Sequence, residues 1–141
     1  MALPDPRPGL VVSHAYLWHH EHLKGLEEGK VRPCVIVLTI ERTHDGDIEV
    51  TVVPVTHRAP PEGATAVEIP HAVKRALGLD DDRSWIILDE GNEFVWPGFD
   101  LRKIPTTGNF HYGFLAPRLF DEVRDKFLAV YRQGRTRLME R

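Results

Sequence analysis

Two apolar, β-branched runs of strand length dominate the hydrophobic pattern of this chain. They span residues 30–38 and 50–57, and each carries polar residues at one end only. An Asp45-Gly46 turn lies between them, which predicts a hairpin-like, antiparallel pairing of the two runs. Antiparallel pairing brings the start of one strand beside the end of the next.

The polar ends of these two runs are therefore expected to share one edge of the sheet. Arg32 stands at the start of the first run, and Thr56 and His57 stand at the end of the second. A cation, a hydroxyl and an imidazole at one edge suit chemistry on a phosphate. The competing interpretation is ordinary surface, because an arginine before a proline and a Thr-His pair after a strand are both common in exposed segments.

The remaining apolar segments predict further short strands. They cover residues 10–18, 65–69, 85–89 and 92–96. The last of these either continues the strand before it or pairs back on it. Residues 19–31 are polar and charged, which predicts a long loop between the first two strands.

Two segments have helical spacing. Residues 71–79 predict a short helix that ends at Gly78, and residues 117–132 predict a longer one with Pro117 at its first position. The chain lacks the alternation of strands and long helices that a parallel α/β sheet requires. We therefore expect a mostly β fold with some α, namely a small antiparallel barrel with a short internal helix and a C-terminal helix.

Length and composition indicate one ordinary globular domain. The chain has 141 residues, of which 42% are hydrophobic and 28% charged. We divide it into a proline-rich arm (1–8), a barrel domain (9–133) and a basic tail (134–141) that is expected to be frayed. The triple aspartate 80–82 is interpreted as solvated surface.

Several classes of protein are disfavoured by the sequence. No run is long and apolar enough to cross a bilayer, and the start of the chain is unlike a signal peptide. The single cysteine, Cys34, is expected to be reduced and buried in a cytoplasmic protein. A net charge of −3 disfavours a general nucleic-acid coat protein but allows a local basic cleft.

The order of the motifs resembles the MazF/PemK toxins of bacterial toxin–antitoxin pairs, most closely their PemK-like branch. The matching segments are residues 9–12 as a first strand, 29–37 with an Arg-Pro motif, 53–56 with a Pro-x-Thr motif, 84–89, and the closing helix. Together they cover most of residues 9–132.

The resemblance implies a fold, an activity and partners. We expect an SH3-like barrel of the CcdB/MazF type that forms a homodimer and cleaves single-stranded RNA without a metal or other cofactor. A small antitoxin protein is expected to neutralise it, and neither a membrane nor DNA is expected as a partner. Substrate sequence preference cannot be carried over from the resemblance.

The resemblance also assigns roles to residues. Its Arg-Pro and Pro-x-Thr motifs map the chemistry to Arg32 and Thr56, and an acidic position on the following strand maps to Asp89. Some members carry an arginine two residues before that acid, where this chain has Ile87. We expect His57 to substitute for it in proton transfer.

Metal-free RNA cleavage needs a base for the 2′-OH, a cation for the charged transition state and an acid for the leaving oxygen. Arg32 suits the cation role, and His57 suits either the base or the acid. Thr56 would orient the phosphate by hydrogen bonding. Asp89 or Glu90 would hold His57 in one tautomer or contact the 2′-OH directly.

Further contacts to the substrate are expected from Lys30, Glu90, Asn92 and Trp96, the last by stacking on a base. Most other aromatic side chains are expected in the core, because a small barrel needs large side chains to fill it. Phe94 and Trp96 share a strand face, so at least one of the pair is expected to be buried.

Two other functions remain open at this point. One is a non-catalytic barrel that binds RNA or a protein partner, which Ile87 and the negative net charge favour. The other is a zinc-dependent hydrolase built on the histidines of residues 14–22, where His20 and His22 would share a face if extended. No matching distal Cys/His pair supports the zinc site, and an exposed histidine-rich loop is the simpler interpretation.

Overall fold

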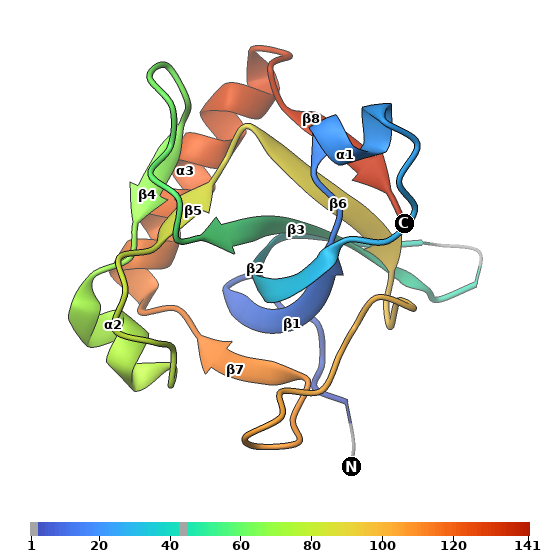
Figure 1. Ribbon diagram of the computed structural model, residues 1–141. Coiled ribbons are helices and arrows are strands. Elements are labelled where there is room, and N and C mark those ends of the chain that lie inside the picture. The colour runs from blue at the N-terminus through green and yellow to red at the C-terminus, as the bar shows by residue number, and fades with distance from the viewer. Residues whose placement is uncertain (1–2, 43–44) are drawn as a thin grey trace.

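The two apolar runs form the central hairpin of a curled, mostly antiparallel sheet (Figure 1). The computed structural model describes residues 3–42 and 45–141. The strands described are β1 (Leu10–Tyr16), β2 (Lys30–Glu41), β3 (Ile48–Thr56), β4 (Ala66–Glu68), β5 (Trp85–Ile87), β6 (Glu90–Val95), β7 (His111–Phe114) and β8 (Arg137–Glu140). The helices described are α1 (His19–Leu23), α2 (His71–Ala76) and α3 (Pro117–Arg132). The expected mostly β fold with a short internal helix and a C-terminal helix is confirmed at this level.

The register of β2 and β3 decides which polar residues meet. Cys34 lies opposite Pro54 and Val35 opposite Val53, so the predicted antiparallel pairing is confirmed. Following this register to the ends of the strands brings Arg32 level with Thr56. The shared edge expected from the sequence is therefore present.

The neighbours of β3 settle how residues 85–96 are arranged. The sheet runs β4-β5-β3-β2-β1-β7, and both β5 and β6 pair with β3. β5 lies against Val55 and Thr56, whereas β6 lies against residues 49–52. Residues 92–96 thus continue along β3 and do not fold back on residues 85–89.

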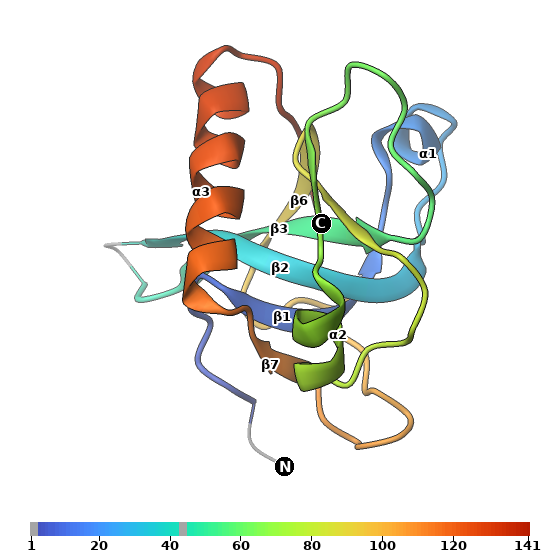
Figure 2. The same cartoon turned by 90° about the vertical axis from the view of Figure 1, so that its left-hand side faces the viewer.

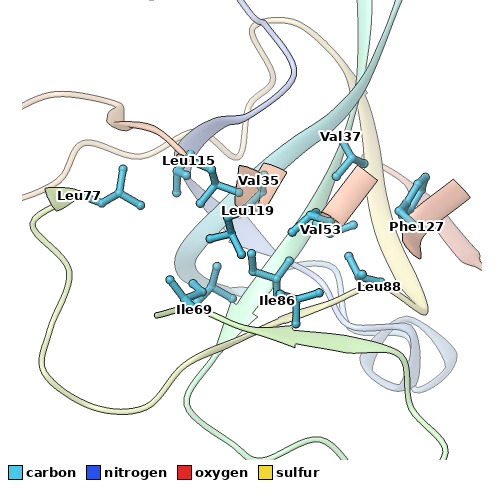
Figure 3. Close-up of a cluster of buried hydrophobic side chains, with 14 residues drawn as sticks. Val35, Val37, Val53, Ile69, Leu77, Ile86, Leu88, Leu115, Leu119 and Phe127 are labelled. Atoms are coloured by element: carbon cyan, nitrogen blue, oxygen red, sulfur yellow. The ribbon is translucent and has the colours of Figure 1, made fainter. Parts of the chain in front are cut away.

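Both faces of the central strands are buried, and every residue of β1 is buried, including the polar Ser13 and His14. One core cluster takes Val35, Val37 and Val53 together with Leu119 and Phe127 of α3 (Figure 3). The alternate residues of β2 and β3, such as Cys34 and Ile36, pack into a second cluster with Phe94 and Tyr16. These alternating positions are the two faces of a pleated strand, and the expected burial of Cys34 is confirmed.

Helix α3 lies across the strands on one side of the sheet (Figure 2). Its buried residues are Leu119, Val123, Phe127 and Val130, the stripe that the sequence predicted. Each such side chain contributes roughly 1.5–3 kcal/mol through burial. No helix in the described ranges is of the length and apolar character that crossing a membrane would take.

Two expectations about loops and ends are wrong. Residues 19–31 contain α1, whose first turn is capped by the Glu21 carboxylate, which accepts a hydrogen bond of 3.0 Å from the Trp18 N–H. The tail is not frayed, because residues 137–140 form β8 and pair in parallel with β6. β8 supplies hydrogen-bond partners along one edge of β6. Residues 137–140 are few, and two of the four are charged, so their sequence gave no reason to expect a strand there.

Candidate functional site

The edge shared by Arg32 and Thr56 lies between two surface hollows. One has a volume of about 350 Å³ and also takes in His57, while the other has a volume of about 520 Å³ and also takes in Trp18. Lys30, Arg32 and Thr56 line both of them. The two hollows therefore make one groove, with a cation and a hydroxyl at its midpoint.

Arg32 is held at this midpoint by an aromatic ring. Its guanidinium carbon lies 5.0 Å from the centre of the Trp18 ring, a cation–π contact that fixes the side chain while leaving its charge unneutralised. Within residues 3–42 and 45–141, no carboxylate forms an ion pair with Arg32, and its buried Nε has no hydrogen-bond partner. An anion in the groove would satisfy this cation.

Thr56 ends β3 in a turn that leaves its hydroxyl proton free. The Oγ1 atom accepts a hydrogen bond of 3.1 Å from the backbone N–H of Arg58. Because a hydroxyl has one donor and two acceptor positions, Thr56 can still donate to a ligand oxygen. Arg58 itself is exposed and lines the larger hollow.

His57 is oriented by a carboxylate, although not by one that the sequence suggested. Its Nε2 lies 2.7 Å from Oδ2 of Asp80, and both side chains are about half exposed. Asp89 and Glu90, which were expected to hold this ring, contact other groups. All three aspartates 80–82 are exposed, as expected for solvated surface, but Asp80 is in addition the partner of the imidazole.

A buried lysine lies directly behind that carboxylate. Lys74 of α2 has a side chain that is 2% exposed, and its Nζ lies 2.5 Å from Oδ1 of Asp80. Burial on its own would raise the pKa of Asp80, but the Lys74 hydrogen bond and the charge of His57 hold it below its usual range. Asp80 is thus kept as an anion beside the imidazole.

Asp89 and Glu90 are used mainly in holding the fold. Both carboxylate oxygens of Asp89 accept from the backbone N–H of Thr65, at 3.2 and 2.9 Å. One oxygen of Glu90 accepts from the Tyr16 hydroxyl and from the His19 N–H, each at 2.9 Å. Both residues line the larger hollow, so they border the groove without contacting His57.

Two of the residues expected to bind substrate do not reach the groove. Asn92 is fully buried, and its amide bonds the backbone of Leu17 at 3.0 and 2.9 Å. Trp96 packs beside Phe94 in the second core cluster, and Phe94 is the buried member of that pair, as expected. Asn92 is therefore a structural residue, and the aromatic residues that line the groove are Trp18 and Tyr112, not Trp96. Lys30 does line both hollows.

The histidines of residues 14–22 are not gathered into a zinc site. His14 is buried in β1, while His20 and His22 lie on α1, where a two-residue spacing turns side chains to different sides. In the described part of the chain, one group has metal-ligand spacing, made by His57, Asp80 and Asp82, all of them exposed. The Lys74 ammonium already supplies a positive charge there, since it contacts Asp80 and the carbonyl of Asp82.

His14 forms a second polar centre, buried beneath β1. Its Nε2 lies 3.2 Å from Oδ1 of Asn92, and its ring stacks on Phe94 with centroids 4.9 Å apart. Burial lowers the pKa of His14 to about 4, against the opposing effect of the Asn92 hydrogen bond. The imidazole is therefore neutral at physiological pH and serves the core.

Sequence reasoning missed Lys74, Asp80 and Trp18 as members of this site. The pairing of Lys74 with residues six to ten positions later joins a helix to a loop, which no periodic pattern encodes. The available signal was Lys74 itself, because a charged residue on the apolar face of the 71–79 helix indicates a buried and therefore paired charge. Trp18 was grouped with the aromatic residues that could stack on bases but were mostly expected in the core. It was not linked to Arg32, because their distance depends on the β1–β2 register.

No protein-family model matches this chain, and no curated protein matches it. What the site can do is therefore argued from its chemistry. It combines an unneutralised guanidinium, a free hydroxyl proton and a carboxylate-bound imidazole in one groove. Such a set can bind an anion and move a proton next to it.

Proposed function

We propose that the chain is a metal-independent endoribonuclease that cleaves single-stranded RNA in this groove. The observation that carries the proposal is the 2.7 Å contact between His57 and Asp80 in the same hollow that Arg32 and Thr56 line. A carboxylate-oriented imidazole next to an unpaired guanidinium supplies both a proton acceptor and a site for the phosphate charge. The curled antiparallel sheet is compatible with an SH3-like barrel of the MazF/PemK type, which is part of this proposal.

The proposed reaction is attack of the ribose 2′-oxygen on the adjacent phosphorus. His57 takes the 2′-OH proton at Nδ1, because its Nε2 is engaged by Asp80. Arg32 and the Thr56 hydroxyl hold the phosphate oxygens while negative charge builds up on them. The bond from phosphorus to the 5′-oxygen breaks, and that oxygen takes a proton from water. His57 returns its proton to the hydroxide so formed, and the products carry a 2′,3′-cyclic phosphate and a 5′-OH.

The groove suits a flexible strand. The two hollows on either side of Arg32 give room for the nucleotides flanking the cleaved phosphate. Trp18 and the consecutive prolines 60 and 61 supply apolar surface in the larger hollow, and Lys30 adds a second cation at the midpoint. A single strand can splay its bases into two such hollows, whereas a duplex keeps its bases stacked.

Partners follow from the same proposal. A small antitoxin with an acidic, disordered segment would neutralise the enzyme by folding onto the groove, with carboxylates on Arg32 and Lys30. The protein would act on RNA in the cytoplasm as a homodimer. These partners rest on the resemblance described from the sequence.

The second candidate is a non-catalytic barrel that binds RNA or a protein. Ile87 favours it: some members of the family carry an arginine at this position, and here the side chain is 8% exposed and apolar. The groove would then bind a strand through Arg32 and Lys30 without breaking it. Binding without cleavage distinguishes this candidate from the first.

The test is incubation of purified protein with a long single-stranded RNA in EDTA. We expect wild type to give discrete fragments and Arg32→Ala to cleave roughly 100-fold more slowly or worse, the scale of losing one transition-state donor. Arg124→Ala is the matched control, because that arginine also lies over an aromatic ring, Phe120, but on α3. It should cleave like wild type. Intact RNA with bound wild type would favour the second candidate, and cleavage only after Mg²⁺ is restored would contradict a metal-independent reaction.

A further inference from the structure

The Lys74 ammonium is fully bonded inside the protein. Its three acceptors are the Asp80 carboxylate at 2.5 Å, the Ser84 hydroxyl at 2.7 Å and the backbone carbonyl of Asp82. An ammonium has three donors, so this set satisfies all of them. Burying a charge costs free energy unless it is paired, and Asp80 is the residue that pairs it.

Asp80 joins this buried charge to the groove. Its Oδ2 contacts His57, and its Oδ1 accepts from Lys74 and, at 3.2 Å, from the backbone N–H of Asp82. The Asp80 side chain is 49% exposed, so water competes for it, and Lys74 supplies the charged contact that opposes this competition. The three side chains therefore form a line from the core, through Asp80, to the reacting imidazole.

We propose that Lys74 is a positioning residue that sets the orientation and tautomer of His57 through Asp80. This inference rests on the proposed function for its catalytic consequence. With Oδ1 held by Lys74, Oδ2 accepts a hydrogen bond from Nε2–H, so the neutral imidazole carries its hydrogen at Nε2 and leaves the lone pair of Nδ1 available in the groove. Without Lys74, Oδ1 keeps only the uncharged contact from the Asp82 N–H, so the half-exposed carboxylate turns toward solvent and the ring loses its fixed tautomer.

A purely structural role for Lys74 is the explanation to exclude. The ammonium also contacts Ser84 and the carbonyl of Asp82, which could simply tie the 80–84 loop to α2. A loss of activity in a Lys74 variant would not separate the two roles. The readout must be the state of the His57 ring.

The first measurement is ¹⁵N NMR of histidine-labelled protein, with His57 assigned by its absence in His57→Ala. Wild type should show the Nε2–H tautomer, and Lys74→Met should show a mixture of both tautomers. Ser84→Ala, which loosens the loop but leaves the Lys74–Asp80 contact, should match wild type. An unchanged tautomer in folded Lys74→Met, or an equal disturbance in Ser84→Ala, would overturn the proposal. If Lys74→Met does not fold, Lys74→Gln keeps a donor in the same space and is interpreted by the same criteria.

The second measurement is a double-mutant cycle on RNA cleavage. Lys74→Met should lower kcat about 10-fold with KM unchanged when His57 is present, and should have no further effect in His57→Ala. Equal losses in both backgrounds would contradict action through His57. The NMR experiment needs no RNA, so an inactive wild type would refute the proposed nuclease and leave the role of Lys74 to be decided by the tautomer alone.

Discussion

His14 and His57 each lie against a polar side chain, and the two sites differ in every respect that matters for chemistry. His14 is buried in β1, lies 3.2 Å from a neutral amide of Asn92, and stacks on Phe94. His57 is half exposed at the end of β3 and lies 2.7 Å from the carboxylate of Asp80. Burial lowers the pKa of His14 to about 4 and so disfavours its charged form. His57 instead borders a hollow that a ligand can enter.

The difference shows that the function of a histidine depends on two things. One is the group that binds Nε2, and the other is whether a ligand can reach Nδ1. The free Nδ1 of His14 faces the core and has no partner among the described residues. His57, by contrast, lines a hollow together with Arg32 and Thr56. The first histidine therefore serves stability, and proton transfer is the role that we propose for the second.

The largest expected effect comes from His57→Ala. Cleavage of a fluorescent RNA in EDTA should slow by roughly 100-fold or more, because general acid–base catalysis typically contributes 10²–10⁴-fold. The thermal midpoint should stay within a few degrees, since the side chain is exposed. His71→Ala is the matched control, an exposed histidine on α2 that lies 3.9 Å from Asp81. Equal rates in the two variants would remove His57 from the mechanism.

The reverse pattern is expected for His14→Ala. Urea denaturation should show a loss of roughly 2–4 kcal/mol, because the substitution leaves a cavity beside Phe94 and removes a partner of Asn92. The rate of RNA cleavage per folded molecule should be retained. A variant of undiminished stability that no longer cleaves would place His14, and not His57, in the chemistry.

Acid should weaken the protein through His14. The pKa of this buried imidazole is lowered from 6.5 to about 4, so the unfolded chain binds the extra proton between these values. The stabilisation is fully present above pH 6.5 and is lost as the pH falls toward 4. Between pH 7 and pH 5 the loss should be about 2 kcal/mol. In His14→Gln the same interval should cost correspondingly less in urea titrations, and parallel curves for the two proteins would disprove this origin.

The smallest predicted effect separates two tryptophans. Trp18→Ala removes the ring under the Arg32 guanidinium and should weaken RNA cleavage roughly 2- to 5-fold, the scale of an exposed cation–π contact. Trp96→Ala should leave kcat/KM of the folded fraction unchanged, because Trp96 packs in the second core cluster outside both hollows. Steady-state kinetics on one RNA substrate measures both. A larger loss in Trp96→Ala would restore the stacking role expected from the sequence.

Periodicity predicted the elements whose burial follows a regular pattern. The helix 117–132 was predicted from its apolar stripe, and the β2–β3 hairpin from its two β-branched runs. Because antiparallel register follows from the hairpin, the shared edge of Arg32 and Thr56 could also be predicted. The short helix α1 could not, since its first turn depends on a side-chain cap from Glu21 within a segment that has no apolar face.

The parts of the site that escaped prediction are held by contacts between segments with no common pattern. Asp80 reaches His57 from a loop after α2, and Trp18 reaches Arg32 from the end of β1. Asn92 was misjudged because the sequence does not distinguish an exposed asparagine from a buried one whose amide bonds the backbone of Leu17. Such contacts depend on the completed fold, and no local rule encodes them.

The most direct test of the nuclease proposal is the identity of the RNA ends after cleavage in EDTA. Mass spectrometry of fragments from a defined single strand should find 2′,3′-cyclic phosphate on one side of each cut and 5′-OH on the other, because His57 and Arg32 are proposed to promote attack by the 2′-oxygen. Fragments ending in 3′-OH and 5′-phosphate, or RNA left intact by wild type, would contradict the account.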